Sequence, residues 1–275
     1  MSIAYYNGEF LDYSEIRIPL SDRAIFFGDG IYDAAIGKGG CIYLKDKHFD
    51  RFFSNAKRLN IPLGFTKEEL SELICELIKR NEYDQYFIYF QLSRTSPTRI
   101  HSYPDSQSSN LLITLREHTL PSINERLRLI SCEDTRYLMC DVKTLNLLPA
   151  VLASRRAVEC GCDEAVFVRD GVVTECAHSN IFIVKDGLVL THPCDRRILP
   201  GVTRARILEI CKDLGIPCLE KSFGKNDLFT ADEVLVSSTT RLCQTAYEID
   251  GIEIEKAKNS ISGAIISSIR RDFGA

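Results

Sequence analysis

The chain has 275 residues, of which 45% are hydrophobic and 26% are charged, and its formal net charge is −4. This length suffices for one large domain or two modest domains with a hydrophobic core, and the lack of any basic stripe argues against nucleic acid as a partner. The sequence begins without a basic and apolar signal region and contains no apolar run of roughly 20 residues, so we expect neither a signal peptide nor a membrane span.

Two elements are expected early in the chain. The apolar residues 31–36 and 41–44 flank Gly37-Lys38-Gly39-Gly40, a pattern that is typical of a β-hairpin. Asp46 is a candidate N-cap for a helix that runs to about Asn60, because phenylalanine and aliphatic residues recur on one face of that segment.

The next segment predicts a second helix and two strands. Thr66 and Glu69 have the spacing of a capping box. Behind them, apolar residues recur at helical spacing over residues 70–78. Two buried strands are expected to follow, over residues 86–92 and 111–115.

The regular pattern breaks over residues 117–124, which contain His118, Pro121 and Ser122. This stretch is the best candidate for a linker. It divides the chain into a small N-terminal domain of residues 1–118 and a larger C-terminal domain of residues 119–275.

The second part predicts two hairpins and a helix. Asp170-Gly171 and Asp186-Gly187 each separate two apolar runs, as the turns of β-hairpins do. A helix is expected to begin at Thr203 as its N-cap and to end near Gly215, since glycine is favoured just past a helix. Further strands are expected over residues 126–132 and 233–237.

Several common catalytic motifs are missing from the sequence. It contains no HExxH, no paired CxxC, no GxSxG elbow and no Walker A loop, and Gly28-Asp29-Gly30 lacks the third glycine of a dinucleotide fingerprint. The 11 cysteines are scattered and lie mostly in apolar segments. We therefore expect reduced thiols, a cytoplasmic protein and no metal site.

Lys143 and Glu175 are the first two residues with possible chemistry. Lys143 lies in an apolar segment, where loss of solvation favours the neutral amine that can attack a carbonyl. The alternative is an ordinary lysine, whose aliphatic chain packs against apolar neighbours while its ammonium group reaches water. Glu175 ends an expected strand and could pair with a pyridinium nitrogen, or it could be an ordinary surface carboxylate.

Three segments could bind a phosphate. Residues 199–203 lead into a helix start that offers free N–H groups, although a capped helix alone explains them. Residues 237–240 are four consecutive hydroxyl side chains, which an ordinary turn also contains. Arg51 lies on a phenylalanine-rich helix and either reaches a phosphate oxygen or stays solvated at the helix edge.

Arg99 and His101 stand two residues apart in a loop after an expected strand. Such a pair can clamp a carboxylate, and binding residues concentrate in loops. Two exposed polar residues on a flexible loop are the alternative. Together, however, these segments supply a lysine, a carboxylate, phosphate donors and a carboxylate clamp, which are the parts of a transaminase that uses pyridoxal 5'-phosphate (PLP).

At these residues the chain resembles the fold-type IV PLP enzymes, a family that contains branched-chain aminotransferases, D-amino acid aminotransferases and aminodeoxychorismate lyases. The resemblance covers almost the full length and is closest to the D-amino acid aminotransferases, because of the Arg-x-His pair and the run around Lys143. It rests on Asp22-Arg23, residues 27–33, residues 48–51, residues 143–146, Thr174-Glu175, residues 179–182, residues 199–204 and residues 238–240.

The resemblance implies an α+β fold of two domains, a small N-terminal α/β sandwich and a larger, β-barrel-like C-terminal domain that binds PLP. It implies that Lys143 forms the Schiff base with PLP and then moves a proton, and that Glu175 pairs with the ring nitrogen. The implied cofactor-binding residues are Arg51, Glu175, Leu199, Val202, Thr203, Ser238 and Thr239. The implied substrate-binding residues are Tyr32, Arg99, His101 and Thr240.

The implied reaction is ping-pong transamination of D-amino acids, such as D-alanine, with 2-oxo acids in a homodimer with shared active sites. A branched-chain L-aminotransferase, an aminodeoxychorismate lyase and a non-catalytic PLP-binding protein are the alternatives. The chain departs from the family pattern at Cys176-Ala177-His178, where the family has glycine and serines, and at Asp33, which replaces a glutamate. Both departures bear on the shape of the substrate pocket.

Overall fold

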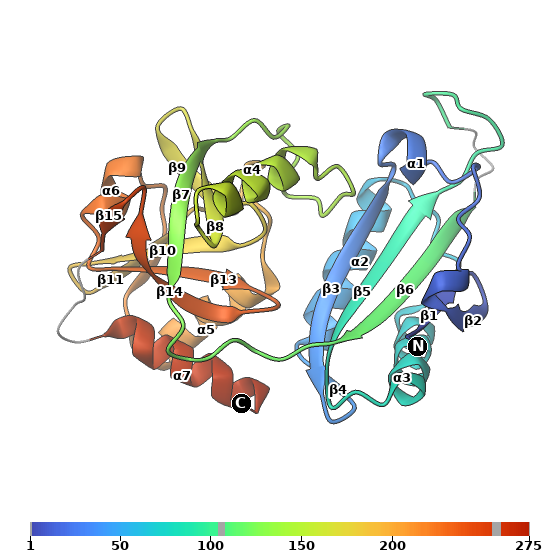
Figure 1. Cartoon of the computed structure of the whole chain (residues 1–275), viewed down its shortest axis with the longest axis horizontal. Coiled ribbons are helices and arrows are strands. Elements are labelled where there is room, and N and C mark those ends of the chain that lie inside the picture. The colour runs from blue at the N-terminus through green and yellow to red at the C-terminus, as the bar shows by residue number, and fades with distance from the viewer. Residues whose placement is uncertain (1, 104–107, 255–259, 275) are drawn as a thin grey trace. The chain divides into compact units, whose positions relative to one another are not determined.

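The computed structural model describes residues 2–103, 108–254 and 260–274. The chain forms two compact units (Figure 1). The first comprises Met1–Thr119 and Val142–Asn146, and the second comprises Leu120–Asp141 and Leu147–Ala275. Mixed helices and sheets in two units confirm the predicted α+β class. Within the described ranges, no helix combines the length and the apolar character that a membrane crossing requires.

The first unit is built on a six-stranded antiparallel sheet with the order β2-β1-β6-β5-β3-β4. Helix α2 packs against β3, and helix α3 packs against β1 and β6. The strands are β1 (Ile3–Tyr6), β2 (Glu9–Asp12), β3 (Gly30–Lys38), β4 (Cys41–Ile42), β5 (Gln85–Arg94) and β6 (Ser109–Glu117). The helices are α1 (Ala24–Phe27), α2 (Lys45–Arg58) and α3 (Lys67–Asn81), with a short 3-10 turn over Tyr13–Glu15.

Short sequence patterns predicted most of these helices and strands. The predicted hairpin is β3–β4, and Gly39 and Gly40 take the positive φ angles of 56° and 83° that its turn requires. The capping box is confirmed, since the Glu69 N–H donates to Thr66 Oγ1 at 3.1 Å and the Thr66 N–H donates to Glu69 Oε2 at 2.7 Å. The prediction that Asp46 caps α2 was wrong. The N-cap is Leu44, and Asp46 lies in the first turn, where the helix dipole stabilises a carboxylate.

The segment Val142–Asn146 lies beside the beginning of β3. The Tyr32 N–H donates to the Lys143 carbonyl at 3.0 Å, and the Leu145 N–H donates to the Gly30 carbonyl at 3.1 Å. By its contacts this short segment belongs to the first unit, although the chain on both sides of it belongs to the second. Its backbone hydrogen bonds therefore fix Lys143 next to Tyr32.

The second unit is built on a nine-stranded sheet that curls on itself (Figure 1). Its order is β12-β11-β10-β13-β14-β7-β8-β9, with β15 paired to β14. The strands are β7 (Leu127–Glu133), β8 (Glu164–Arg169), β9 (Val172–Cys176), β10 (Asn180–Lys185), β11 (Leu188–Thr191), β12 (Cys218–Glu220), β13 (Glu233–Ser238), β14 (Leu242–Ile249) and β15 (Ile252–Glu253). The helices are α4 (Leu148–Glu159), α5 (Val202–Asp213), α6 (Lys225–Phe229) and α7 (Ile261–Phe273).

Both predicted Asp-Gly hairpins are present as β8–β9 and β10–β11. Asp170 and Asp186 have φ angles near 50°, and the glycine after each has a φ of 78°. Two positive φ values in succession are those of the type I′ turn, which matches the twist of paired strands. Glu175 lies near the end of β9, just before the connection to β10, and belongs to the site described below.

Candidate active site

Lys143 and Tyr32 form the chemical centre of the first unit. The Lys143 Nζ donates a hydrogen bond to the Tyr32 hydroxyl at 3.1 Å and lies 4.2 Å from the centre of the Tyr32 ring. The Tyr32 ring in turn stacks on Tyr89, with their centroids 5.4 Å apart. Both neighbours of Lys143 in the chain are buried, whereas Lys143 itself is half-buried. The lysine amine is therefore held in a fixed place and is still open to a reaction partner.

Arg51 belongs to a buried cluster with Asp33 and His48. Arg51 donates from Nε and Nη2 to the two carboxylate oxygens of Asp33, each at 2.8 Å. The His48 Nδ1 lies 2.8 Å from Asp33 Oδ1. Burial of Asp33 raises the pKa of its carboxyl, but the Arg51 charge and the hydrogen bonds from His48 and Arg51 outweigh burial and hold that pKa well below its usual range. Asp33, the residue that departs from the family pattern, thus orients Arg51, the side chain predicted to bind the phosphate.

The same cluster makes the stability of the protein depend on pH. Burial lowers the pKa of His48 from its ordinary value, although its hydrogen bond to Asp33 opposes the shift. As the pH falls below about 6.5, the unfolded chain therefore takes up a proton that the folded protein resists, and the free energy of unfolding decreases. In urea unfolding at pH 7.5 and 5.5, we expect His48→Gln to reduce this loss by about 1 kcal/mol. An unchanged pH dependence in the variant would contradict the assignment.

Glu175 lies in the second unit at the end of β9 and is 5% exposed. Its Oε2 accepts hydrogen bonds from the Asn180 side chain and from the Leu199 N–H, each at 3.0 Å. Its Oε1 accepts a hydrogen bond from Arg136. Donors of this kind stabilise the ionised carboxylate, which is the form that can hold a protonated ring nitrogen.

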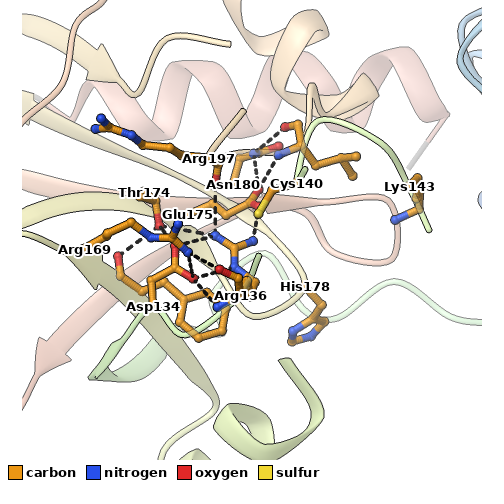
Figure 2. A network of polar contacts seen from close by, with 12 residues as sticks. Asp134, Arg136, Cys140, Lys143, Arg169, Thr174, Glu175, His178, Asn180 and Arg197 are labelled. Carbon is orange, nitrogen blue, oxygen red and sulfur yellow. Dashed lines mark hydrogen bonds and ion pairs between the residues drawn. The ribbon is translucent and has the colours of Figure 1, made fainter. Parts of the chain in front are cut away.

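Figure 2 shows Arg136 between the carboxylates of Asp134 and Glu175. Arg136 donates to Asp134 Oδ1 and Oδ2 at 2.9 and 3.0 Å, and its guanidinium lies 4.5 Å from the centre of the Phe167 ring. Arg169 adds a second positive charge 3.0 Å from Asp134. Sequence reasoning missed Arg136 and Asp134, because nothing in the segment after β7 indicates that it reaches a strand 39 residues away.

The expected phosphate segment begins helix α5. The prediction that Thr203 is the N-cap was wrong, because the helix begins at Val202 and its N-cap is Gly201. A Cβ atom at Gly201 would lie 2.0 Å from Asn180 Oδ1, so only glycine fits. Val202 and Thr203 are buried in the first turn, where the N–H groups of a helix favour an anion.

The hydroxyl segment ends strand β13, against which α5 packs. Ser238 and Thr239 are half-buried, and Ser238 Oγ lies 3.4 Å from Thr240 Oγ1. Ser237 is 2% exposed, and in the described part of the chain its hydroxyl has no hydrogen-bond partner. Ser237 lies opposite Asn180 in the β10–β13 pairing, and the Asn180 side chain contacts Gly201, the N-cap of α5, which has no side-chain cap hydrogen bond. An orphaned buried hydroxyl near such a helix start fits a phosphate group.

Arg99 and His101 are exposed, and the structure brings them to one aromatic ring in the first unit. The Arg99 guanidinium lies 5.2 Å from the centre of the Phe27 ring, and the His101 ring lies 5.2 Å from the same ring. The predicted site residues of the first unit therefore form three local groups, Lys143 with Tyr32, Arg51 with Asp33, and Arg99 with His101. In the second unit, Glu175 and Leu199 are hydrogen-bonded to each other, while residues 202–203 and 238–240 lie on two packed elements.

Comparison with known proteins gives a consistent result. The family model described as "Amino-transferase class IV" matches residues 30–249. The chain is 36% identical to a D-alanine aminotransferase of Staphylococcus haemolyticus over 94% of this chain and 93% of that one. It is 34% identical to a D-alanine aminotransferase of Listeria monocytogenes, over 97% and 93% of the two chains.

Solved structures with the same fold include a branched-chain aminotransferase from Thermoproteus uzoniensis, with a TM-score of 0.90, 24% identity and coverage of 99% of this chain and 95% of that one. A second is a putative 4-amino-4-deoxychorismate lyase from Legionella pneumophila, with a TM-score of 0.86, 24% identity and coverage of 95% and 97%. At these identities the likeness describes the fold. It confirms the α+β fold of the fold-type IV enzymes that the resemblance implied.

Proposed function

The chain belongs to the class IV aminotransferases, and on that premise we propose that it transfers amino groups between D-amino acids, such as D-alanine, and 2-oxo acids. The observation that carries the choice of D-amino acids is the Arg99–His101 pair, gathered on the Phe27 ring in a chain that is 36% identical to a D-alanine aminotransferase. An arginine and a histidine side chain at one place can bind the carboxylate that every amino acid and 2-oxo acid carries.

PLP is the cofactor that fits these residues. Lys143 would attach it, Glu175 would hold its ring nitrogen, and Leu199 would lie against its ring. Its phosphate would be bound by Arg51, Val202, Thr203, Ser238 and Thr239. The orphaned hydroxyl of Ser237 and the N–H groups at the start of α5 support a phosphate group there. When bound, PLP withdraws electrons from the substrate Cα.

The side chains of the protein then divide the remaining work. The Lys143 amine would take the proton from the substrate Cα and deliver it to the C4' carbon of the cofactor, and the Tyr32 hydroxyl, 3.1 Å from Nζ, orients that amine. Glu175, whose carboxylate accepts hydrogen bonds from three donors, would hold the protonated ring nitrogen of the cofactor. Arg99, His101, Tyr32 and Thr240 bind the substrate. The two half-reactions alternate in a ping-pong cycle, with 2-oxoglutarate or pyruvate as the acceptor.

Substrate choice is tested by incubating the purified enzyme with D-alanine or L-leucine, each with 2-oxoglutarate, and measuring the 2-oxo acid formed. We expect pyruvate from D-alanine and no product from L-leucine. Activity on L-leucine alone would contradict the Arg99–His101 assignment and make the protein a branched-chain aminotransferase. Release of pyruvate from aminodeoxychorismate without any acceptor would instead identify a lyase.

We also propose a homodimer with shared active sites, in which the loop of Arg99 and His101 serves the partner subunit. The apolar face of α4 supports an interface, since Leu148, Val151 and Leu152 are 68%, 57% and 61% exposed. A monomer in sedimentation equilibrium would contradict the dimer.

The proposed compartment is the cytoplasm, because the 11 cysteines, all within the described residues, are free thiols. Cell fractionation tests this proposal.

A further inference from the structure

Arg23 connects the body of the first unit to the backbone of the Arg99–His101 loop. Arg23 immediately precedes α1, and it is 4% exposed. Its Nη1 donates to the Ile100 carbonyl at 2.6 Å, and its Nη2 donates to the His101 carbonyl at 3.0 Å. A planar guanidinium thus holds two consecutive carbonyl groups of an exposed loop.

Arg23 is itself held on its other side. Its Nε donates to Asp29 Oδ2 at 2.6 Å, and Asp29 also accepts a hydrogen bond from Arg94 Nε at 3.1 Å. Arg94 is 2% exposed, and its Nη2 and Nη1 donate to the carbonyls of Leu59 at 2.6 Å and Asn60 at 2.9 Å. The two buried guanidinium groups therefore share one carboxylate, and the direction of the Arg23 fork is fixed by groups outside the loop.

The side chains of the loop and Arg23 contact the same aromatic ring, that of Phe27. The Arg23 guanidinium lies 4.6 Å from the centre of the Phe27 ring. Arg99 and His101 contact that ring as well, as described above. Arg23 therefore fixes the loop in two ways, through hydrogen bonds to its backbone and through the Phe27 ring that Arg99 and His101 contact.

We propose that Arg23 is a positioning residue that fixes the Arg99–His101 loop and so sets the affinity of the enzyme for substrate carboxylates. The part of this inference that concerns substrates rests on the function proposed above, whereas the part that concerns the loop rests on the contacts alone. The guanidinium fork is the essential feature, because a single ammonium group cannot reach both carbonyls and Asp29 together.

The test compares Arg23→Met and Arg23→Lys with Arg80→Ala, which removes an exposed arginine of α3 that pairs with Glu76. Steady-state kinetics with D-alanine, thermal unfolding and trypsin cleavage after the exposed Arg99 are measured for each. We expect both Arg23 variants to raise KM by about tenfold or more with little change in kcat, since two charge-assisted hydrogen bonds to the loop are lost. Arg80→Ala serves as the control, with wild-type KM.

Three outcomes separate the possibilities. Arg23→Lys keeps the charge beside Asp29, so it should recover thermal stability relative to Arg23→Met and yet keep the raised KM and faster cleavage at the Arg99–Ile100 bond. A KM that simply follows thermal stability across the variants, or unchanged cleavage in both, would overturn the proposal. If the wild-type enzyme does not turn over D-alanine, faster cleavage in both variants still supports the loop anchor, and the proposed function alone fails.

Discussion

Replacing Lys143 with alanine is expected to lower the rate of transamination by at least about 10³-fold without unfolding the protein. The Nζ of Lys143 makes its hydrogen bond to the Tyr32 hydroxyl from a half-buried position. Removing the Lys143 side chain therefore deletes the proton acceptor, and the buried polar groups that it leaves without a hydrogen-bond partner are few. The Val142–Asn146 segment stays in place, because backbone hydrogen bonds from Tyr32 and Leu145 hold it.

The measurement is pyruvate formation from D-alanine and 2-oxoglutarate, together with the absorbance spectrum of the protein after addition of PLP. The matched control is Lys67→Ala, which removes an exposed lysine that pairs with Asp50 on the surface. The control should keep wild-type activity and spectrum. Retention of a tenth or more of the activity in Lys143→Ala would place the proton acceptor on another side chain.

The second large effect is expected for Glu175→Gln, which should lower kcat by about 10²-fold or more. A neutral amide cannot keep a proton on the ring nitrogen, so the cofactor would lose most of its power to withdraw electrons. The amide would also face the Arg136 guanidinium with an N–H group, and the free energy of unfolding should fall because a buried ion pair is broken. The fold remains, since Arg136 keeps both hydrogen bonds to Asp134.

This prediction is checked by single-turnover kinetics with D-alanine and by thermal unfolding of the same preparation. Glu159→Gln is the control, because Glu159 forms an exposed pair with Arg155 on α4. An active Glu175→Gln enzyme with reduced stability would mean that Glu175 is only a structural partner of Arg136. A slow enzyme with nearly unchanged stability would assign it to the chemistry alone.

Local signals in the sequence predicted the elements that depend on local chemistry. The Asp170-Gly171 and Asp186-Gly187 turns and the capping box of Thr66 each involve residues a few positions apart, so their geometry follows from the residue types alone. Helix α4 is different. Its buried face consists of Ala150, Ala153 and Ala157, whereas its large apolar side chains are exposed, so the usual periodicity does not indicate which side packs.

The site residues follow the same division. Residue types and their order along the chain were enough to single out Lys143 and Glu175 as candidates. Their partners were not predictable, because the Arg136–Glu175 and Arg51–Asp33 pairs depend on contacts between separate elements. Arg51 illustrates the difference, since the sequence indicated a cationic side chain near a phosphate but not the buried carboxylate that orients it.

The assignment of Val142–Asn146 to the first unit has a consequence for how the chain is synthesised and folds. A polypeptide that has emerged only as far as Thr119 still lacks the segment that pairs with Gly30 and Tyr32. The edge of β3 at Gly30 and Tyr32 therefore stays unpaired until residue 146 has left the ribosome. By that time part of the second unit has also been made. The two units are interleaved along the chain, so a single cut between them cannot yield a complete N-terminal fragment.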